Sequence, residues 1–425
     1  MRKMYSNALL LVCLSVVMLW IGAKWNVVES AFFKGLGGAS AEEEPFVIER
    51  EFERVLTLPE RQPIYMKGEA FIQIGELEAN QPVVVTGENE VYYELRLGNM
   101  TAFVRKGKET VEKKKLSTLV RTERFAAVST LHKTAVYEEA DLQSAIFLQL
   151  EEGYRYPIIK EIEDWYIIAI GERPGYIEKQ TVTLDKGLPV LVYHHILPRD
   201  LMETTASTIS LEAFEQQMEY LSDHQFMTLT AHQLYDYLEG RLVVPGKAVL
   251  ITFDDGLLST KEYAYPILKQ YGFRALQHII SSRTDRAQGV QTFHTEGPLQ
   301  YLTAADLNEL ADVFQFEAHT YELHSLQNGV DLGVGLDRSQ EEIVLDLQRN
   351  LEQVPAAVSL AYPYGHYNEA FIAAAKEVGL LVGFTTSEGY ANRSASNYEV
   401  CRFGMTENRS FEQFVAYVDG DMTWP

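Results

Sequence analysis

The chain has 425 residues, 46% of them hydrophobic, so it is long enough for two or three domains with packed cores and is not globally disordered. Its formal net charge of -23 argues against general binding to nucleic acid, because a phosphate backbone repels an acidic surface. The only two cysteines, Cys13 and Cys401, lie near opposite ends of the chain. No internal disulfide and no zinc site built from thiolates is therefore expected.

The first 25 residues predict export from the cytoplasm. Arg2 and Lys3 precede an uncharged apolar run from Ala8 to Ala23, which is close to the length that spans a bilayer. The basic residues should stay on the cytoplasmic side. We expect residues 1–25 to form an uncleaved membrane anchor, with a cleaved signal peptide as the alternative, followed by a linker over 26–44. Either way the protein body lies outside the cytoplasm, with an extracellular catalytic domain at the cell membrane or secreted.

A weak internal repeat follows the linker. The segment "YYELRLGNMTAFVRK" at 92–106 matches "WYIIAIGERPGYIEK" at 165–179, and each is typical of two strands joined by a glycine-containing turn. We expect two small all-β modules, over residues 45–115 and 120–183. Their pattern resembles bacterial SH3-like domains, which implies binding to the cell wall. The alternative is a pair of spacers that separate a catalytic domain from the membrane.

The second half, residues 186–425, alternates strand-like and helix-like segments. Apolar runs such as "KAVLITFDDG" and "FQFEAHT" are separated by amphipathic stretches such as "SLEAFEQQMEYLSDH" and "SQEEIVLDLQRNLEQ". This alternation predicts β/α units around a parallel sheet, and the length favours a closed or nearly closed barrel. In such barrels the active site lies at the C-terminal ends of the strands.

Two adjacent carboxylates, Asp254 and Asp255, follow an apolar run in "ITFDDG". Adjacent carboxylates at a strand end repel each other unless a cation or hydrogen-bond donors compensate. On its own, Asp-Asp-Gly is more typical of a plain turn. Beside histidines, however, one carboxylate can hold a metal ion and the other can take a proton from an activated water.

Two histidines, His319 and His324, lie five positions apart in "FEAHTYELHSL". This spacing is wrong for one face of a helix and for one face of a strand. It becomes workable if His319 ends a strand and the following loop folds His324 back over the same rim. Taken alone, such histidines are more often polar surface or satisfied core residues.

A third segment, "LAYPYGHYN" at 360–368, places Tyr364 between Pro363 and Gly365 after another apolar strand. Such a turn can aim a backbone N–H at a developing oxyanion, although an ordinary β-to-α loop looks the same.

The motifs "TFDDG", "HTYELH" and "YPYG", in this order, resemble those of the NodB-type polysaccharide deacetylases of carbohydrate esterase family 4. The resemblance covers residues 186–425. The five-residue histidine spacing and the strand "LPVLVYHHI" are similar to the branch that includes poly-N-acetylglucosamine deacetylases. The implied fold is a distorted (β/α) barrel of the NodB type, here preceded by the two SH3-like modules and the membrane anchor.

The resemblance implies one divalent metal ion held by Asp255, His319 and His324. It assigns Asp254 as the general base and the backbone N–H of Tyr364 as an oxyanion donor. A shell of two histidines and one carboxylate suits zinc best and also accepts iron, cobalt or nickel.

The sequence departs from the family pattern at two positions. Many relatives carry an arginine two residues before the motif proline, where Ala361 stands here, and a late histidine as general acid, whereas the last histidine here is His366. With His366, we expect His194 and His195 to be the only other histidines at the rim. His195 is the first candidate for the acid, with His194 close behind.

The expected function is metal-dependent N-deacetylation of an extracellular polysaccharide that contains N-acetylglucosamine, with release of acetate. One alternative is a non-catalytic cell-wall-binding protein with a degenerate deacetylase domain, which the two departures motivate. Another is a deacetylase of small acylated sugars. The expected partners are the polysaccharide, the cell wall through the modules and the membrane through the N-terminal segment, with no nucleic acid.

Overall fold

The structure is a computed structural model that describes residues 46–420, apart from 68–70, 98–99, 120–125, 171, 241 and 290. The predicted anchor and linker therefore lie outside the described residues. Within those residues, no helix is long and apolar enough to cross a membrane. From Val47 onward the chain forms one compact unit.

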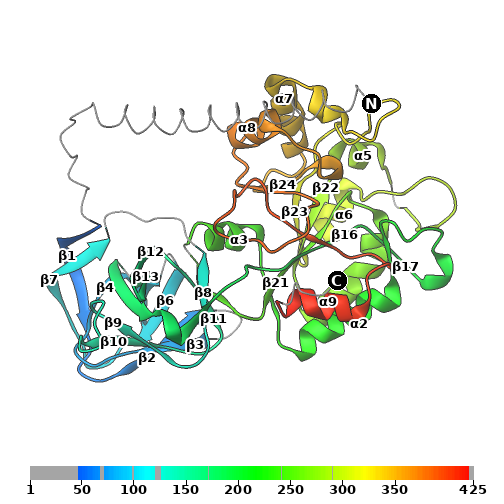
Figure 1. Cartoon of the computed structure of the whole chain (residues 1–425). Helices are drawn as coiled ribbons and strands as arrows, with labels where there is room; N and C mark the ends of the chain where they lie inside the picture. Colours follow the sequence, from blue (N-terminus) through cyan, green and yellow to red (C-terminus); the bar gives the residue numbers. More distant parts are fainter. Residues whose placement is uncertain are drawn as a thin grey trace, which may run out of the picture. The chain divides into compact units, whose positions relative to one another are not determined.

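Residues 46–184 are almost entirely β-structure (Figure 1). The pattern of single strands explains this: in "YYELRL", the buried Tyr93, Leu95 and Leu97 alternate with more exposed neighbours, as in a strand with one face on a core. The strands are β1 (Val47–Thr57), β2 (Gln62–Lys67), β3 (Phe71–Leu77), β4 (Pro82–Glu88), β5 (Tyr92–Leu97), β6 (Met100–Arg105), β7 (Thr110–Leu119), β8 (Ala127–Thr130), β9 (Thr134–Tyr137), β10 (Ile146–Leu150), β11 (Tyr154–Pro157), β12 (Lys160–Ile162), β13 (Trp165–Ile170), β14 (Arg173–Glu178) and β15 (Val182–Leu184).

Strands from both predicted modules join in one sheet of twelve strands. The connection is direct, because β10 pairs with β3 and β13 pairs with β5, all antiparallel. Buried side chains from both segments, such as Ile74 and Leu148, also share one hydrophobic cluster. The two repeats therefore pack around a common core, and their identity as SH3-like modules stays a prediction.

The second half has the predicted alternation of strands and helices. The strands are β16 (Val190–Tyr193), β17 (His195–Leu197), β18 (Thr208–Ser210), β19 (Met227–Thr228), β20 (Val244–Pro245), β21 (Ala248–Phe253), β22 (Ala275–Ile279), β23 (Phe314–Ala318), β24 (Ser359–Ala361), β25 (Val382–Phe384) and β26 (Phe403–Gly404). The helices are α2 (Leu211–Asp223), α3 (Ala231–Leu238), α4 (Tyr265–Tyr271), α5 (Ser281–Arg286), α6 (Ala304–Glu309), α7 (Gln340–Leu351), α8 (Glu369–Glu377) and α9 (Phe411–Val418).

The central sheet runs in the order β25-β24-β23-β22-β21-β16-β26, with β19 also on β21, and its pairings are parallel. The segment after β25 reaches both edges of this sheet. Val400 bridges Phe384 at one edge, while Phe403 and Gly404 pair with β16 at the other. This segment brings the sheet close to closure, in agreement with the predicted (β/α) architecture.

Helix starts follow local capping chemistry. Ser210 caps α2 by accepting a hydrogen bond from the Ala213 N–H, and Ser339 forms a capping box with Glu342 at the start of α7. The apolar face of α7 then buries Ile343 and Leu347. The C-terminal helix α9, red in Figure 1, packs against α2 through Tyr220, Phe411 and Phe414.

The parallel sheet determines where the motifs meet. Because all its strands point the same way, the residues that follow β21, β23 and β24 emerge at one rim. These residues are Asp254 and Asp255 after β21, His319 after β23, and Tyr364 shortly after β24.

Candidate metal centre and active site

The structure brings Asp255, His319 and His324 together. Their ligand atoms all lie within 4.8 Å of one another. The Asp255 Oδ1 atom is 3.4 Å from His319 Nε2 and 3.2 Å from His324 Nε2. The five-residue spacing thus places both rings on one carboxylate.

Left-handed backbone conformations make this convergence possible. Asp255, Thr320 and Tyr364 have φ values of 73°, 67° and 59°, which non-glycine residues seldom adopt. Thr320 follows His319 directly, so its conformation turns the chain at the end of β23. Strained residues of this kind gather at functional sites, where the surrounding structure holds them.

The donor atoms fit a small divalent cation. Asp255 Oδ1 is buried and makes no well-aligned hydrogen bond within the described residues, despite its short distances to both rings. A tetrahedral shell with metal–ligand distances of about 2.0–2.1 Å places neighbouring ligand atoms about 3.3 Å apart. The two distances from the carboxylate to the histidines match this value, and all three ligand atoms lie within 4.8 Å of one another, so the residues present are suited to holding such an ion.

The first histidine is oriented by a backbone group. His319 Nδ1 lies 2.7 Å from the carbonyl oxygen of Ala361, which favours the proton on Nδ1 and leaves Nε2 facing Asp255. Burial lowers the pKa of His324 and so favours its neutral form. Burial alone would raise the pKa of Asp255, but the two histidine rings close to its carboxylate keep this pKa below its usual value. Neutral imidazoles and an ionised carboxylate are the forms that bind metal.

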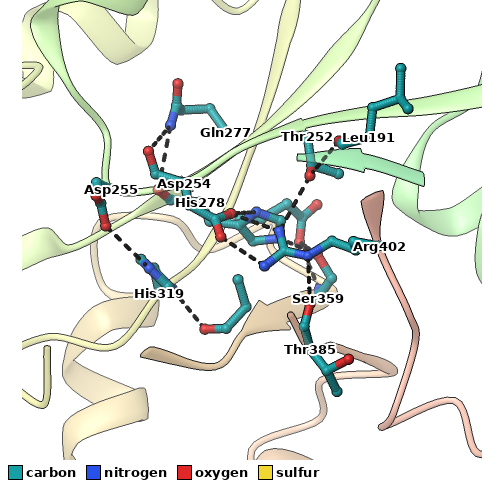
Figure 2. A network of polar contacts seen from close by, with 12 residues as sticks. Leu191, Thr252, Asp254, Asp255, Gln277, His278, His319, Ser359, Thr385 and Arg402 are labelled. Carbon is teal, nitrogen blue, oxygen red and sulfur yellow. Dashed lines mark hydrogen bonds and ion pairs between the residues drawn. The ribbon is translucent and has the colours of Figure 1, made fainter. Parts of the chain in front are cut away.

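The second carboxylate, Asp254, is held by a buried arginine (Figure 2). Arg402 donates from Nη1 to Oδ1 at 2.9 Å and from Nη2 to Oδ2 at 2.7 Å, and its side chain has no exposed area. His278 Nδ1 lies 3.0 Å from Oδ1, a close contact without good hydrogen-bond alignment. Burial would raise the pKa of Asp254, but the guanidinium of Arg402 and then His278 hold it well below its usual value. Asp254 is therefore ionised and fixed in orientation.

Arg402 and His278 are functional residues that the sequence interpretation missed. The guanidinium absent at Ala361 is supplied by Arg402, 148 residues after Asp254, from the segment that closes the sheet. The expectation that only His194, His195 and His366 would join the pair at the rim was wrong, because buried His278 reaches Asp254 from β22. Its sequence signal was weak: Gln277 and His278 interrupt the apolar run of a strand, where polar groups need partners.

The three rim histidines of the sequence analysis have different surroundings. His195 Nδ1 lies 2.7 Å from Ser259 Oγ, and burial lowers the pKa of this histidine. His194 lies close enough to Asp255 to contribute to the lowered pKa of that carboxyl. His366 Nδ1 accepts a hydrogen bond from the Gly333 N–H at 3.1 Å, which ties it to a neighbouring loop. The general-acid role of His195 stays a prediction.

Tyr364 lies at the mouth of the site. Its ring centroid is 4.5 Å from that of His324, and 38% of the residue is exposed. A cavity of about 820 Å³ opens beside His324. Its lining includes Ser282, Arg283, Arg286, Tyr301 and Glu322. This space is large enough for sugar units next to the metal centre.

Glu317 is a further buried carboxylate near the rim. Glu317, in β23, accepts hydrogen bonds from the backbone N–H groups of Val358 and Ser359 at 2.8 and 2.6 Å, and from the Ser359 hydroxyl at 2.9 Å. Ser359 Oγ also lies 3.2 Å from His278 Nε2. Burial raises the pKa of Glu317 to about 8 despite these hydrogen bonds.

Replacing Glu317 with glutamine should remove a pH dependence of stability. Because the folded pKa is raised from 4.5 to about 8, the folded state holds a proton that the unfolded state releases. The wild type should therefore lose stability as pH rises through this window and level off above it. Melting temperatures of the metal-free protein from pH 5 to 9 test this, with the exposed Glu322→Gln as control. Parallel curves for wild type and Glu317→Gln would contradict it.

Paired carboxylates and two histidines at the C-terminal rim of a parallel β/α sheet form a site whose residues could hold a metal ion and support hydrolysis. Residues 242–383 match the family described as polysaccharide deacetylase. The chain therefore carries a polysaccharide deacetylase domain and is an enzyme of that class.

The chain is similar to several named proteins. The poly-beta-1,6-N-acetyl-D-glucosamine N-deacetylase of Staphylococcus epidermidis is 29% identical over 249 residues, covering 54% of this chain and 82% of that relative. The enzyme of the same name from Staphylococcus aureus is 28% identical over 221 residues, covering 50% and 72%. Among solved structures, IcaB from Ammonifex degensii is 28% identical with a TM-score of 0.47, covering 55% of this chain and 97% of that structure.

Proposed function

We propose that the protein is a metal-dependent N-deacetylase that releases acetate from an extracellular polysaccharide containing N-acetylglucosamine. The observation that carries the metal requirement is the convergence of Asp255, His319 and His324 at spacings that suit a tetrahedral ion. The substrate class is supported by the names of the staphylococcal relatives, which are poly-beta-1,6-N-acetyl-D-glucosamine N-deacetylases.

The residues of the site have different roles in the proposed reaction. A divalent cation held by Asp255, His319 and His324, zinc in first place and iron, cobalt or nickel as alternatives, would polarise the amide carbonyl and acidify a water. Asp254 accepts the proton of the attacking water. Its low pKa makes it a weak base but keeps it ionised, and Arg402 keeps it in place.

The remaining groups act on the substrate. The turn at Tyr364 presents a backbone N–H for the oxyanion of the tetrahedral intermediate. Collapse of the intermediate yields acetate and a free amine once a proton reaches the leaving nitrogen. His195 and His194 are the candidates for that proton transfer.

Arg402 weakens the non-catalytic alternative. That alternative rested on two departures from the family pattern, and one of them, the missing arginine at Ala361, is offset by a guanidinium on the base from another part of the chain. We further propose a location outside the cytoplasm, at the membrane or secreted, from the pattern of residues 1–25. The β-structure of residues 47–184 would contact the cell wall.

The full-length protein should release acetate from N-acetylglucosamine oligomers after loading with zinc. Acetate release should stop on chelation and return on adding zinc back, because the ligand set is formed by the folded chain. A series of oligomers of increasing length separates a polymer enzyme from one that acts on small acylated sugars, since only the former should favour longer chains. Metal-loaded protein that binds the oligomers without ever releasing acetate would rule out the enzymatic function.

A further inference from the structure

The loop between the two predicted metal-binding histidines is held by its backbone between two helices. From the start of α5, the N–H groups of Ser281 and Ser282 donate to the carbonyl oxygens of Thr320 and Tyr321 at 3.3 and 3.2 Å. These bonds fix one side of the loop. The other side faces α7, whose residues belong to none of the three motifs.

Asp346 of α7 fixes two amides of this loop. Its Oδ1 accepts from the Tyr321 N–H at 2.7 Å, and its Oδ2 accepts from the Glu322 N–H at 2.9 Å. One carboxylate therefore accepts hydrogen bonds from two consecutive backbone N–H groups that lie outside the helices and strands.

Asn350 lies one helical turn further on and holds the strained residue. Its Nδ2 donates to the carbonyl oxygen of Thr320 at 2.6 Å, and it also lies 2.8 Å from the Ile279 carbonyl oxygen and 2.9 Å from Ser281 Oγ. The residue has no exposed area. Asn350 thus joins the end of β22, the start of α5 and the left-handed Thr320 at one point.

The contacts form one face of α7. Asp346 and Asn350 are four positions apart, and Arg349 stacks on the Tyr321 ring with its guanidinium 3.8 Å from the ring centroid. Positions i, i+3 and i+4 lie together on a helix surface. Three side chains of α7 therefore contact the loop of four residues between His319 and His324.

We propose that Asp346 and Asn350 are positioning residues that hold Thr320–Glu322 in the conformation that brings His324 back to His319 and Asp255, and so set the affinity of the metal centre. The inference rests on the proposed metal-binding function. The loop has to turn at a left-handed Thr320 to bridge the five-residue spacing, and such a conformation persists only where neighbours fix it. Partners outside the ligand shell commonly change metal affinity 10- to 100-fold.

The full-length protein tests this with Asp346→Ala and Asn350→Ala, and with Leu347→Ala as a matched control. Leu347 is fully buried on the same helix and packs into the core cluster around Ile343 and Phe371. We expect the zinc dissociation constant, measured against a competing chelator, to rise about 10- to 100-fold in the two test variants. Leu347→Ala should lower the melting temperature of the metal-free protein at least as much, with a zinc affinity close to that of the wild type.

A second readout does not involve metal. In the metal-free protein, the amides of Tyr321 and Glu322 should exchange with solvent faster in Asp346→Ala than in Leu347→Ala, because only the former loses their acceptor. If Asp346→Ala does not fold, Asp346→Asn serves in its place, since its single amide oxygen satisfies only one of the two N–H groups.

The outcomes separate the two proposals. A folded Asp346→Ala or Asp346→Asn with wild-type zinc affinity and amide exchange overturns the positioning role. Equal loss of zinc affinity in Leu347→Ala also overturns it, because the effect would then come from general destabilisation. A wild-type protein that binds none of zinc, iron, cobalt or nickel would refute the metal-dependent function itself. Faster amide exchange in Asp346→Ala would still show that α7 fixes the loop.

Discussion

Replacing Asp255 with asparagine should reduce zinc affinity by more than about 100-fold and reduce acetate release to background. Loss of a hydrogen-bond partner outside the ligand shell already lowers metal affinity about 10- to 100-fold, and this change removes the only carboxylate of the shell itself. Asparagine is the appropriate replacement because it tolerates the left-handed backbone at φ 73°, so the variant should not add strain. Alanine would combine loss of the ligand with a backbone penalty.

The same result is expected for His319→Ala and His324→Ala, because a shell of three protein ligands cannot lose one without large loss of affinity. His224→Ala is the matched control, since His224 lies on the exposed end of α2 and contacts Tyr220. Zinc content after dialysis, measured beside melting curves of the metal-free proteins, distinguishes ligands from packing residues. Wild-type zinc content in either rim-histidine variant, with a lowered melting temperature, would contradict the site.

Short-range patterns were enough to predict the catalytic half. Each apolar run such as "KAVLITFDDG" or "FQFEAHT" forms a strand of the parallel sheet, and the amphipathic stretches between them form helices. Because every strand points the same way, their C-terminal residues had to meet at one rim. This topology predicts that Asp255 and His319 share one rim, and the family resemblance supplied their shared role as ligands.

The partners of Asp254 could not be predicted in this way. Arg402 lies in a short strand-like segment 148 residues away, and a fully buried arginine is rare enough that sequence reasoning assigns it to the surface. Its position depends on which segment closes the sheet, which no local pattern encodes. His278 lies beside Gln277 in a short strand, and the only signal in the sequence was this polar pair inside an apolar run.

In the β-rich half, too, local pairings could be predicted from the sequence and distant ones could not. The repeat predicted the hairpins β5–β6 and β13–β14, which depend on a local turn. It did not predict that β10 pairs with β3, because strand pairing across about seventy residues depends on tertiary packing. Contacts with the catalytic half are also non-local, as in the pairing of β11 with β20.

Removing the buried guanidinium in Arg402→Met should be among the most damaging single changes in the catalytic half. The Asp254 carboxylate would remain buried without its main counter-charge, and breaking a buried ion pair in this way typically costs about 3–5 kcal/mol of folding free energy. Asp254→Asn should behave differently. It should keep its zinc and lose activity by about 10² to 10⁴, because it removes the general base and leaves the ligands intact.

The double variant Asp254→Asn/Arg402→Met decides whether the pair acts as one unit. Once the carboxylate is gone, loss of the guanidinium no longer leaves a buried anion, so the double variant should be more stable than the sum of the single changes predicts. Its activity should be no lower than that of Asp254→Asn, since Arg402 acts on the reaction through Asp254.

Arg393→Met is the control, because Arg393 is equally buried but donates to the carbonyl oxygens of Leu238 and Ile158. It should lower the melting temperature without lowering acetate release per folded molecule. Additive losses of stability and activity in the double variant would show that Arg402 does not serve the base.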